Sequence, residues 1–281
     1  MIASRVVCIW YPSGGFGHFV NAILSLYGHD FVRPSVSEFD FGITGDSHSL
    51  ELTAPKWFHD PDNYQFNFED QRRYTVLIDN GINNEGTKFQ QYFNTSEIVR
   101  IVYNDVSWPI IAKTNIVKAM KRSLDNELGP DRGLWPEDAA WAIREKYFLY
   151  LTRHSLQRAW RPRDDCKNLY IEKLQNYESL IHWLQTSGFI IDDFRPFHTR
   201  WLEQNLEYFE PMNTARSVLQ SVYGRTFLDL TPIDDLWTQA VVNYAIYQAT
   251  GFEVPANDYA NWFTNTKQIV TMLEEHGVNF D

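Results

Sequence analysis

The apolar positions of this chain form short runs that alternate with helical stripes as far as about residue 190. Four runs are too short for buried helices and contain many β-branched or aromatic residues, which is typical of strands. These predicted strands cover residues 5–10, 74–78, 98–103 and 168–172. Because the first three are apolar at nearly every position, they indicate strands that are buried on both faces, as in a parallel sheet.

Stripes with helical spacing follow the strands. Phe19, Ile23 and Leu26 share one face of a helix that Gly28 would end. A similar stripe over residues 177–184 predicts a second helix, which Gly188 would end. Further helices are predicted from Pro109 through Met120 and over residues 137–160, 197–208, 212–222, 234–250 and 256–276.

The order of these elements defines the expected architecture. Strands alternate with helices up to residue 192, which predicts an α/β core with a mostly parallel sheet covered on both faces. Only helices are predicted after that point. We therefore expect one domain, with an α/β core at residues 1–192 and a helical C-terminal part at 193–281. Residues 29–70 show no clear period and are expected to form a long irregular excursion.

Composition narrows the classes of partner. The 281 residues carry 25 basic and 36 acidic side chains, and the net charge of −11 argues against a nucleic-acid partner. The sequence has no apolar stretch suited to a membrane span or a secretory signal, so we expect a cytoplasmic protein. Its two cysteines, Cys8 and Cys166, are too few for a disulfide framework. The lack of metal-ligand spacings and of a Gly-x-Ser-x-Gly motif argues against a metal centre and a serine hydrolase.

The segment with the most candidate chemistry is residues 11–18, Tyr-Pro-Ser-Gly-Gly-Phe-Gly-His, between the first strand and the first helix. In this position, backbone N–H groups and the positive end of a helix can hold an anion, and glycines let a ligand approach the backbone. The segment is not a Walker A loop, because no Gly-Lys-Ser/Thr follows. It also departs from the dinucleotide fingerprint, since Val20 takes the place of the third glycine. A tight strand-to-helix turn without a ligand is the alternative interpretation.

This segment resembles the phosphosulfate-binding loop of the sulfotransferases, whose pattern is Tyr-Pro-Lys-Ser-Gly-Thr-Thr-Trp-Leu. The matching residues are Tyr11, Pro12 and Gly15, whereas the family's lysine falls on Ser13, its serine on Gly14, its threonines on Phe16 and Gly17, and its tryptophan on His18. Later segments resemble the same family in order and spacing, namely those ending at Asn80 and Asp105 and those at residues 169–174 and 197–202.

The resemblance implies a three-layer fold of the P-loop nucleoside-triphosphatase type. It also implies transfer of a sulfuryl group from 3′-phosphoadenosine 5′-phosphosulfate to a hydroxyl of a small molecule or glycan. The implied cofactor-binding residues are Ser13, Gly14, Gly15, Phe16, Gly17, His18 and, near the position of the family's phosphate-binding arginine, Asn104. That arginine is missing here, and Lys113 on the following helix is a candidate replacement. The family's C-terminal Arg-Lys-Gly motif has no counterpart in this sequence.

A sulfuryl transferase needs a base near the loop to accept the proton of the acceptor hydroxyl. Asp79 is the first candidate, because it ends the strand that resembles the family's histidine-bearing strand, and His18 and His48 follow it. Each residue also has a structural interpretation: Asp79 as a turn cap, His18 as a packed residue at a helix start, and His48 as ordinary loop polarity.

Three functions remain open on the sequence alone. The first is the sulfotransferase, and the second is a binding or structural protein that keeps the scaffold without the chemistry, as the missing lysine and arginine favour. The third is a nucleotide-dependent phosphotransferase. Four arginines within residues 153–163 could also clamp a phosphate or sulfate, although a solvated helix face is the more ordinary interpretation. The acceptor and the oligomeric state are left open.

Overall fold

The computed structural model describes residues 6–11, 16–33, 72–79, 97–103, 106–115, 162–223 and 236–251. The chain forms two compact units. The first consists of Met1–Tyr103 and Ala159–Leu206, and the second of Asn104–Arg158 and Glu207–Asp281. The first unit holds the sheet and the segment that follows its first strand.

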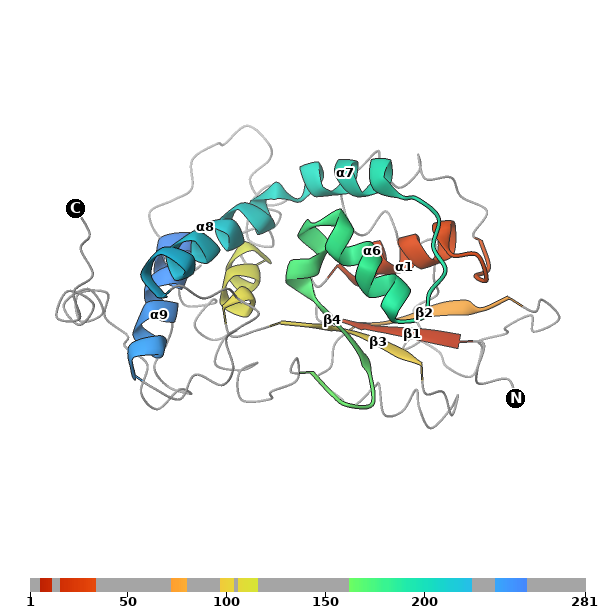
Figure 1. Ribbon diagram of the computed structural model, residues 1–281, viewed down its shortest axis with the longest axis horizontal. Coiled ribbons are helices and arrows are strands. Elements are labelled where there is room, and N and C mark those ends of the chain that lie inside the picture. The colour runs from red at the N-terminus through yellow and green to blue at the C-terminus, as the bar shows by residue number, and fades with distance from the viewer. Residues whose placement is uncertain are drawn as a thin grey trace, which may run out of the picture. The chain divides into compact units, whose positions relative to one another are not determined.

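The first unit contains a four-stranded parallel sheet (Figure 1). Its strands are β1 (Val6–Tyr11), β2 (Tyr74–Asp79), β3 (Ile98–Val102) and β4 (Lys167–Tyr170), in the order β2-β1-β3-β4. Every neighbouring pair is parallel. The α/β class and the parallel sheet predicted from the sequence are therefore confirmed.

The central strands β1 and β3 are buried at every position, as their apolar sequences predict. Helix α1 (Gly17–Tyr27) covers one face of the sheet, where the Ser25 hydroxyl lies 3.1 Å from the Thr75 hydroxyl of β2. Helix α6 (Tyr177–Thr186) lies on the same side of the sheet as α1 (Figure 1). The helix predicted from the stripe at Phe19, Ile23 and Leu26 is confirmed, and it ends just before Gly28 as expected.

The chain leaves β4 in a tight turn. The strand ends at Tyr170, two residues before its predicted end, and passes into the 3₁₀ helix η6 (Ile171–Gln175). Asn176 then caps α6, since its side-chain oxygen accepts a hydrogen bond of 2.9 Å from the Ser179 amide. Gly188, with φ 85°, follows the helix in the left-handed conformation that glycine adopts without steric cost.

The break between the next two helices differs from the prediction. Helix α7 (Arg195–Gln204) ends at Asn205, and α8 (Leu206–Tyr223) continues through Pro211, so the expected boundary at residues 208–212 was wrong. The buried Asn205 side chain donates 2.7 Å to the Trp201 carbonyl oxygen and thereby satisfies one of the last acceptors of α7. Pro211 lies only six positions into α8, where its missing N–H costs a single backbone hydrogen bond.

Helix α7 packs antiparallel to α1 through aromatic side chains. Tyr27, at the end of α1, contacts Phe194 and Phe197, whose ring centroids lie 5.9 and 5.7 Å away. Near the start of α1, the Phe19 ring stacks on Trp201 at 3.6 Å with an interplanar angle of 8°. Since Phe19 is fully buried, these rings form the core between the two helices.

Ion pairs hold the amino edge of the sheet. Glu97, directly before β3, pairs with Arg73, before β2, and with the ammonium of Lys167, the first residue of β4. Burial alone would raise the pKa of Glu97, but hydrogen bonds and charge from Arg73 and Lys167 lower it. Lys167 also donates 2.6 Å to the Ser187 carbonyl oxygen. One carboxylate thus joins the starts of three strands.

Nearly all described residues of the second unit are helical. They comprise residues 107–115, α8 from Glu207 onward and α9 (Leu236–Thr250). The helix predicted after Pro109 and that predicted over 234–250 are confirmed within these bounds. The Tyr208 hydroxyl of α8 donates 2.9 Å to the Asn115 side-chain oxygen, which joins two of these helices. Among the described residues, no helix combines the length and the hydropathy needed to cross a membrane.

Candidate functional site

The carboxyl edge of the sheet brings together the ends of four strands, at Tyr11, Asp79, Val102 and Tyr170. After β1 the chain adds β2 on one side, and it then returns to place β3 on the other side of β1. The connections from β1 and β3 therefore lead in opposite directions. Such a switch point in a parallel sheet leaves a crevice outside the strand ends where ligands bind. The segment between β1 and α1 begins at this point.

The backbone turns into α1 at Phe16, which has φ 58° and ψ 26°. A left-handed backbone costs a residue with a side chain about 1–2 kcal/mol. The Phe16 carbonyl oxygen accepts hydrogen bonds from the amides of Phe19 and Val20, at 3.0 and 3.2 Å. The Phe16 side chain makes no capping hydrogen bond, and the first turn of the helix carries no acidic residue. This helix end therefore keeps its positive dipole, which favours an anion.

Gly17 is required by the close approach of Tyr11. A Cβ atom at residue 17 would lie 2.1 Å from Cδ1 and 2.3 Å from Cγ of the Tyr11 ring. Tyr11 is itself buried, with 4% of its surface exposed, so its ring has little room to move. Gly17 was predicted to let a ligand approach the backbone, whereas in the structure it makes room for the Tyr11 ring of β1.

His18 lies in the first turn of α1 and is 5% exposed. Its Nε2 atom lies 3.0 Å from the Tyr11 hydroxyl, and the two rings meet edge to face at 5.6 Å. The structure thus places a predicted site residue at the switch point, held by a hydrogen bond to the last residue of β1. Sequence reasoning did not identify this pairing, although the spacing of seven residues across a strand-to-helix turn was visible.

The other predicted residues stand as follows. Asp79 ends β2 opposite Tyr11, so its backbone is at the expected edge, while its side chain lies outside the description. Ser13, Gly14, Gly15, His48 and Asn104 lie outside the described residues. Lys113 belongs to the helical second unit, where burial lowers the pKa of its ammonium. Phe16, Gly17 and His18 are thus the predicted site residues that the structure brings together.

The same edge carries a buried acid that sequence reasoning did not single out. Glu172 lies in η6, immediately after β4, and is 7% exposed. A carboxylate is rarely buried to this extent, so an acid at this position is unusual. Its only signal in the sequence is a single acid within the apolar run Leu169–Leu174.

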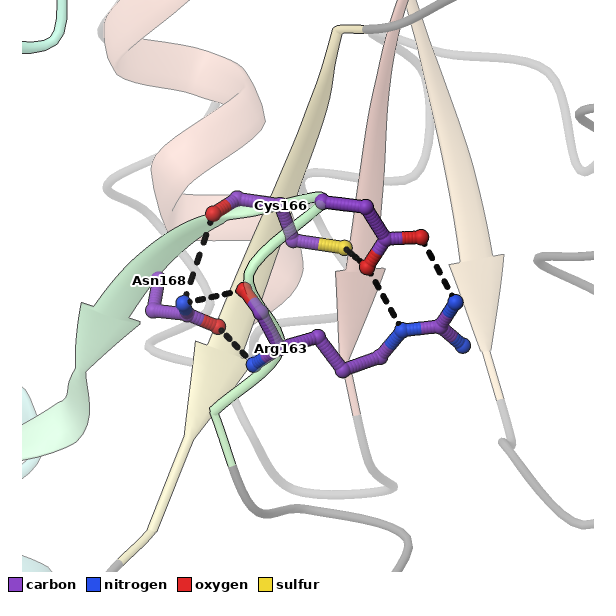
Figure 2. Close-up of polar contacts among 4 residues, drawn as sticks. Arg163, Cys166 and Asn168 are labelled. Atoms are coloured by element: carbon purple, nitrogen blue, oxygen red, sulfur yellow. Dashed lines mark hydrogen bonds and ion pairs between the residues drawn. The ribbon is translucent and has the colours of Figure 1, made fainter.

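Of the four arginines within residues 153–163, the structure describes Arg163. Its side chain forms an ion pair within its own loop. Its guanidinium donates to both carboxylate oxygens of Asp165, at 2.8 and 2.6 Å. Asn168 ties the same loop to β4, because its side chain bonds the Arg163 amide and carbonyl and the Cys166 carbonyl (Figure 2). These contacts favour a structural role for Arg163 over an anion clamp.

Neither cysteine is suited to nucleophilic chemistry. Burial raises the pKa of Cys8 well above its ordinary value, and burial followed by the charge of Asp165 raises the pKa of Cys166 to about 11. Both are free thiols. Because β3 lies between β1 and β4, the two cysteines are separated by two strand spacings, about 9–10 Å, which exceeds the Cα separation of a disulfide.

His198 anchors α7 beside the site. Its Nε2 atom donates 2.8 Å to the Leu174 carbonyl oxygen of η6, and the ring lies 6.1 Å from Phe19 and 6.2 Å from Trp201. Burial lowers the pKa of His198, with a smaller contribution from the charge of Arg195, although the hydrogen bond to Leu174 opposes them. The imidazole is therefore neutral in the folded protein at pH 7.

We expect this histidine to make stability depend on pH. Its folded pKa lies below the ordinary value of 6.5, so the unfolded chain binds the proton more tightly. The contribution of His198 to stability should be complete above pH 6.5 and decrease as the pH falls below it. In His198→Gln, whose amide can still donate to Leu174, urea unfolding should show a smaller loss of stability between pH 7 and pH 5. An undiminished loss in this variant, beside a His182→Gln control on the exposed face of α6, would contradict the assignment.

Comparison with protein-family models, with curated proteins and with solved structures found no match to this chain. The function of this edge of the sheet is therefore inferred from its residues and geometry.

Proposed function

We propose that this protein is a sulfotransferase-like member of the P-loop nucleoside-triphosphatase type that binds 3′-phosphoadenosine 5′-phosphosulfate at the carboxyl edge of its sheet. The observation that supports this proposal is the order of parts at the switch point. A buried strand, a segment with two glycines and the start of α1 follow one another there. The sequence of that segment resembles the phosphosulfate-binding loop, and its position in the sheet is the one that such a loop requires.

The described residues suit an anionic phosphate or sulfate. Backbone amides in the first turn of α1 can donate hydrogen bonds to an anion, and the helix dipole adds partial positive charge there. No carboxylate in that turn repels an anion. The segment Ser13–Gly15 would complete the cradle. When bound, the cofactor would supply the sulfuryl group. The protein would hold its phosphosulfate and align the acceptor hydroxyl of a small molecule or glycan.

The acceptor proton needs a base on the same edge. Asp79 ends β2 beside Tyr11 in the register of the sheet, so its backbone is one strand spacing from the end of β1. His18 is closer to the helix start, but the hydrogen bond to Tyr11 occupies its Nε2 atom. Asp79 is therefore the base that we propose, with His18 as a residue that orients Tyr11 and with His48 as a further candidate.

A binding protein without catalysis is the second candidate. It is favoured by Ser13, which stands where the family has the lysine that neutralises charge on the leaving phosphate. The burial of His18 against Tyr11 favours it as well, because a buried pair is poorly placed to exchange protons with a substrate. A nucleotide-dependent phosphotransferase is the third candidate. It is less favoured, because this sequence lacks both the lysine and the magnesium-binding hydroxyl of a Walker A loop.

Ligand-induced thermal stabilisation separates these candidates. We expect 3′-phosphoadenosine 5′-phosphate to raise the melting temperature, because a ligand that binds only the folded state stabilises it, by about 2.7 kcal/mol at a concentration of 100 Kd. Two comparison ligands are used separately: ATP together with magnesium, and sulfate by itself. Stabilisation by ATP with magnesium alone would favour the phosphotransferase, and no shift with any of the three would contradict nucleotide binding.

The variant Gly15→Leu locates the site. A bulky side chain in the cradle should abolish the shift while leaving the far-ultraviolet circular dichroism unchanged. A shift that persists in this variant would place the ligand elsewhere. Transfer of labelled sulfate to a panel of phenols, alcohols and glycans then distinguishes the transferase from the binding protein, with Asp79→Asn expected to lose transfer and keep the thermal shift.

A further inference from the structure

Trp201 of α7 packs against the start of α1. Its ring lies edge-on to Phe16 at 5.2 Å, with an interplanar angle of 88°, and stacks on Phe19 at 3.6 Å. Trp201 thus contacts both the residue before the helix and a residue of its first turn. Phe16 and Phe19 are both buried.

Phe16 is the place where such support matters. Among the described residues it is the one with a side chain and a positive φ, and its carbonyl oxygen accepts the first two hydrogen bonds of α1. The left-handed backbone is unfavourable for phenylalanine unless surrounding contacts fix it. The ring of Phe16, which is 4% exposed and packed against Trp201, supplies such a contact.

We propose that Trp201 is a positioning residue for the candidate site, because it keeps Phe16 left-handed and thereby directs the first-turn amides of α1 toward the ligand. This inference rests on the proposed function for the identity of the ligand. Its structural part, the control of the helix start by Trp201, is independent of any ligand. Among the predicted site residues, Trp201 packs on Phe16, and it therefore acts through the start of α1.

Hydrogen exchange tests the structural part. In Trp201→Leu the amides of Phe19 and Val20 should exchange about tenfold faster than in the wild-type protein, relative to the change at the far end of α1. The matched control is Trp183→Leu, since Trp183 is also buried but packs on Phe189 and donates to the Asn168 carbonyl oxygen. The control should raise exchange to the same degree at both ends of α1.

A rescue variant separates positioning from simple packing. Phe16→Gly places in the left-handed position the residue that adopts it without steric cost. Added to Trp201→Leu, it should restore much of the first-turn protection if Trp201 serves to fix that conformation. If Trp201 only fills space, adding Phe16→Gly should make the amides of Phe19 and Val20 exchange faster still. Uniform exchange along α1 in Trp201→Leu, or no rescue in the double variant, would overturn the proposal.

Affinity measurements link the helix start to the ligand. By calorimetry, 3′-phosphoadenosine 5′-phosphate should bind Trp201→Leu about tenfold more weakly than the wild-type protein, with Trp183→Leu unchanged. Binding that is equal in both variants would overturn the functional part of the inference. If the wild-type protein does not bind this nucleotide, the proposed function fails, and the exchange experiment still decides whether Trp201 positions the start of α1.

Discussion

Replacing Phe19 by alanine is expected to lower the free energy of unfolding by about 3–5 kcal/mol, the range found for large aromatic truncations in protein cores. Phe19 is fully buried, stacks on Trp201 at 3.6 Å and lies 5.7 Å from Phe197. Its loss leaves a cavity between α1 and α7 that neither neighbouring ring can fill in its present position. Urea unfolding followed by circular dichroism gives the value.

Two further variants control this measurement. Phe19→Leu retains most of the buried volume and should cost clearly less than Phe19→Ala. Ile190→Ala removes an apolar side chain that is 65% exposed, and surface changes of this kind stay within about 0.5 kcal/mol. A Phe19→Ala effect no larger than that of Ile190→Ala would show that α7 does not pack on α1 as described.

The sheet could be predicted because its signal is local. Each strand is a short apolar run, and the run at residues 5–10 matches β1 with a shift of one residue. Burial on both faces leaves no polar alternation, so the parallel character was also visible. The strand order was not predictable in this way, since the placement of β1 between β2 and β3 depends on contacts between residues about 70 to 90 positions apart.

The boundary between α7 and α8 shows where local signals mislead. Proline is usually a sign that a helix ends, and Pro211 made a break near it the natural prediction. The actual break is at Asn205, whose side chain finds an acceptor in the preceding turn. A cap formed by a buried asparagine depends on tertiary burial, which the sequence pattern does not report.

The sequence predicted where the candidate site lies, but not which side chains contact one another there. Glycines between a strand and a helix located the start of α1, and His18 was identified as a polar residue there. That His18 is engaged by Tyr11, and that Trp201 supports Phe16, follow from how β1 and α7 pack on α1. The stripe Phe194, Phe197, His198 and Trp201 has helical spacing, so the apolar face of α7 was visible, but its partner was not.

Gly17→Ala is expected to destabilise the protein by about 1–3 kcal/mol, the usual cost of inserting a methyl group into a filled core. Alanine is the better helix former, by about 1 kcal/mol in a helix interior, so propensity alone predicts the opposite sign. The clash should prevail, because the new Cβ would lie 2.1 Å from the Tyr11 ring and that ring is buried beneath α1. Thermal or urea unfolding measures the sign directly.

A double-mutant cycle with Tyr11→Ala identifies the cause. Tyr11→Ala removes the ring atoms that meet the new Cβ, so Gly17→Ala should be neutral or stabilising in that background, where only helix propensity remains. The two substitutions should therefore couple strongly. If Gly17→Ala costs the same with and without the Tyr11 ring, the glycine is needed for another reason. A ligand approaching the backbone at the start of α1 would then be the first explanation to test, by repeating the cycle with 3′-phosphoadenosine 5′-phosphate present.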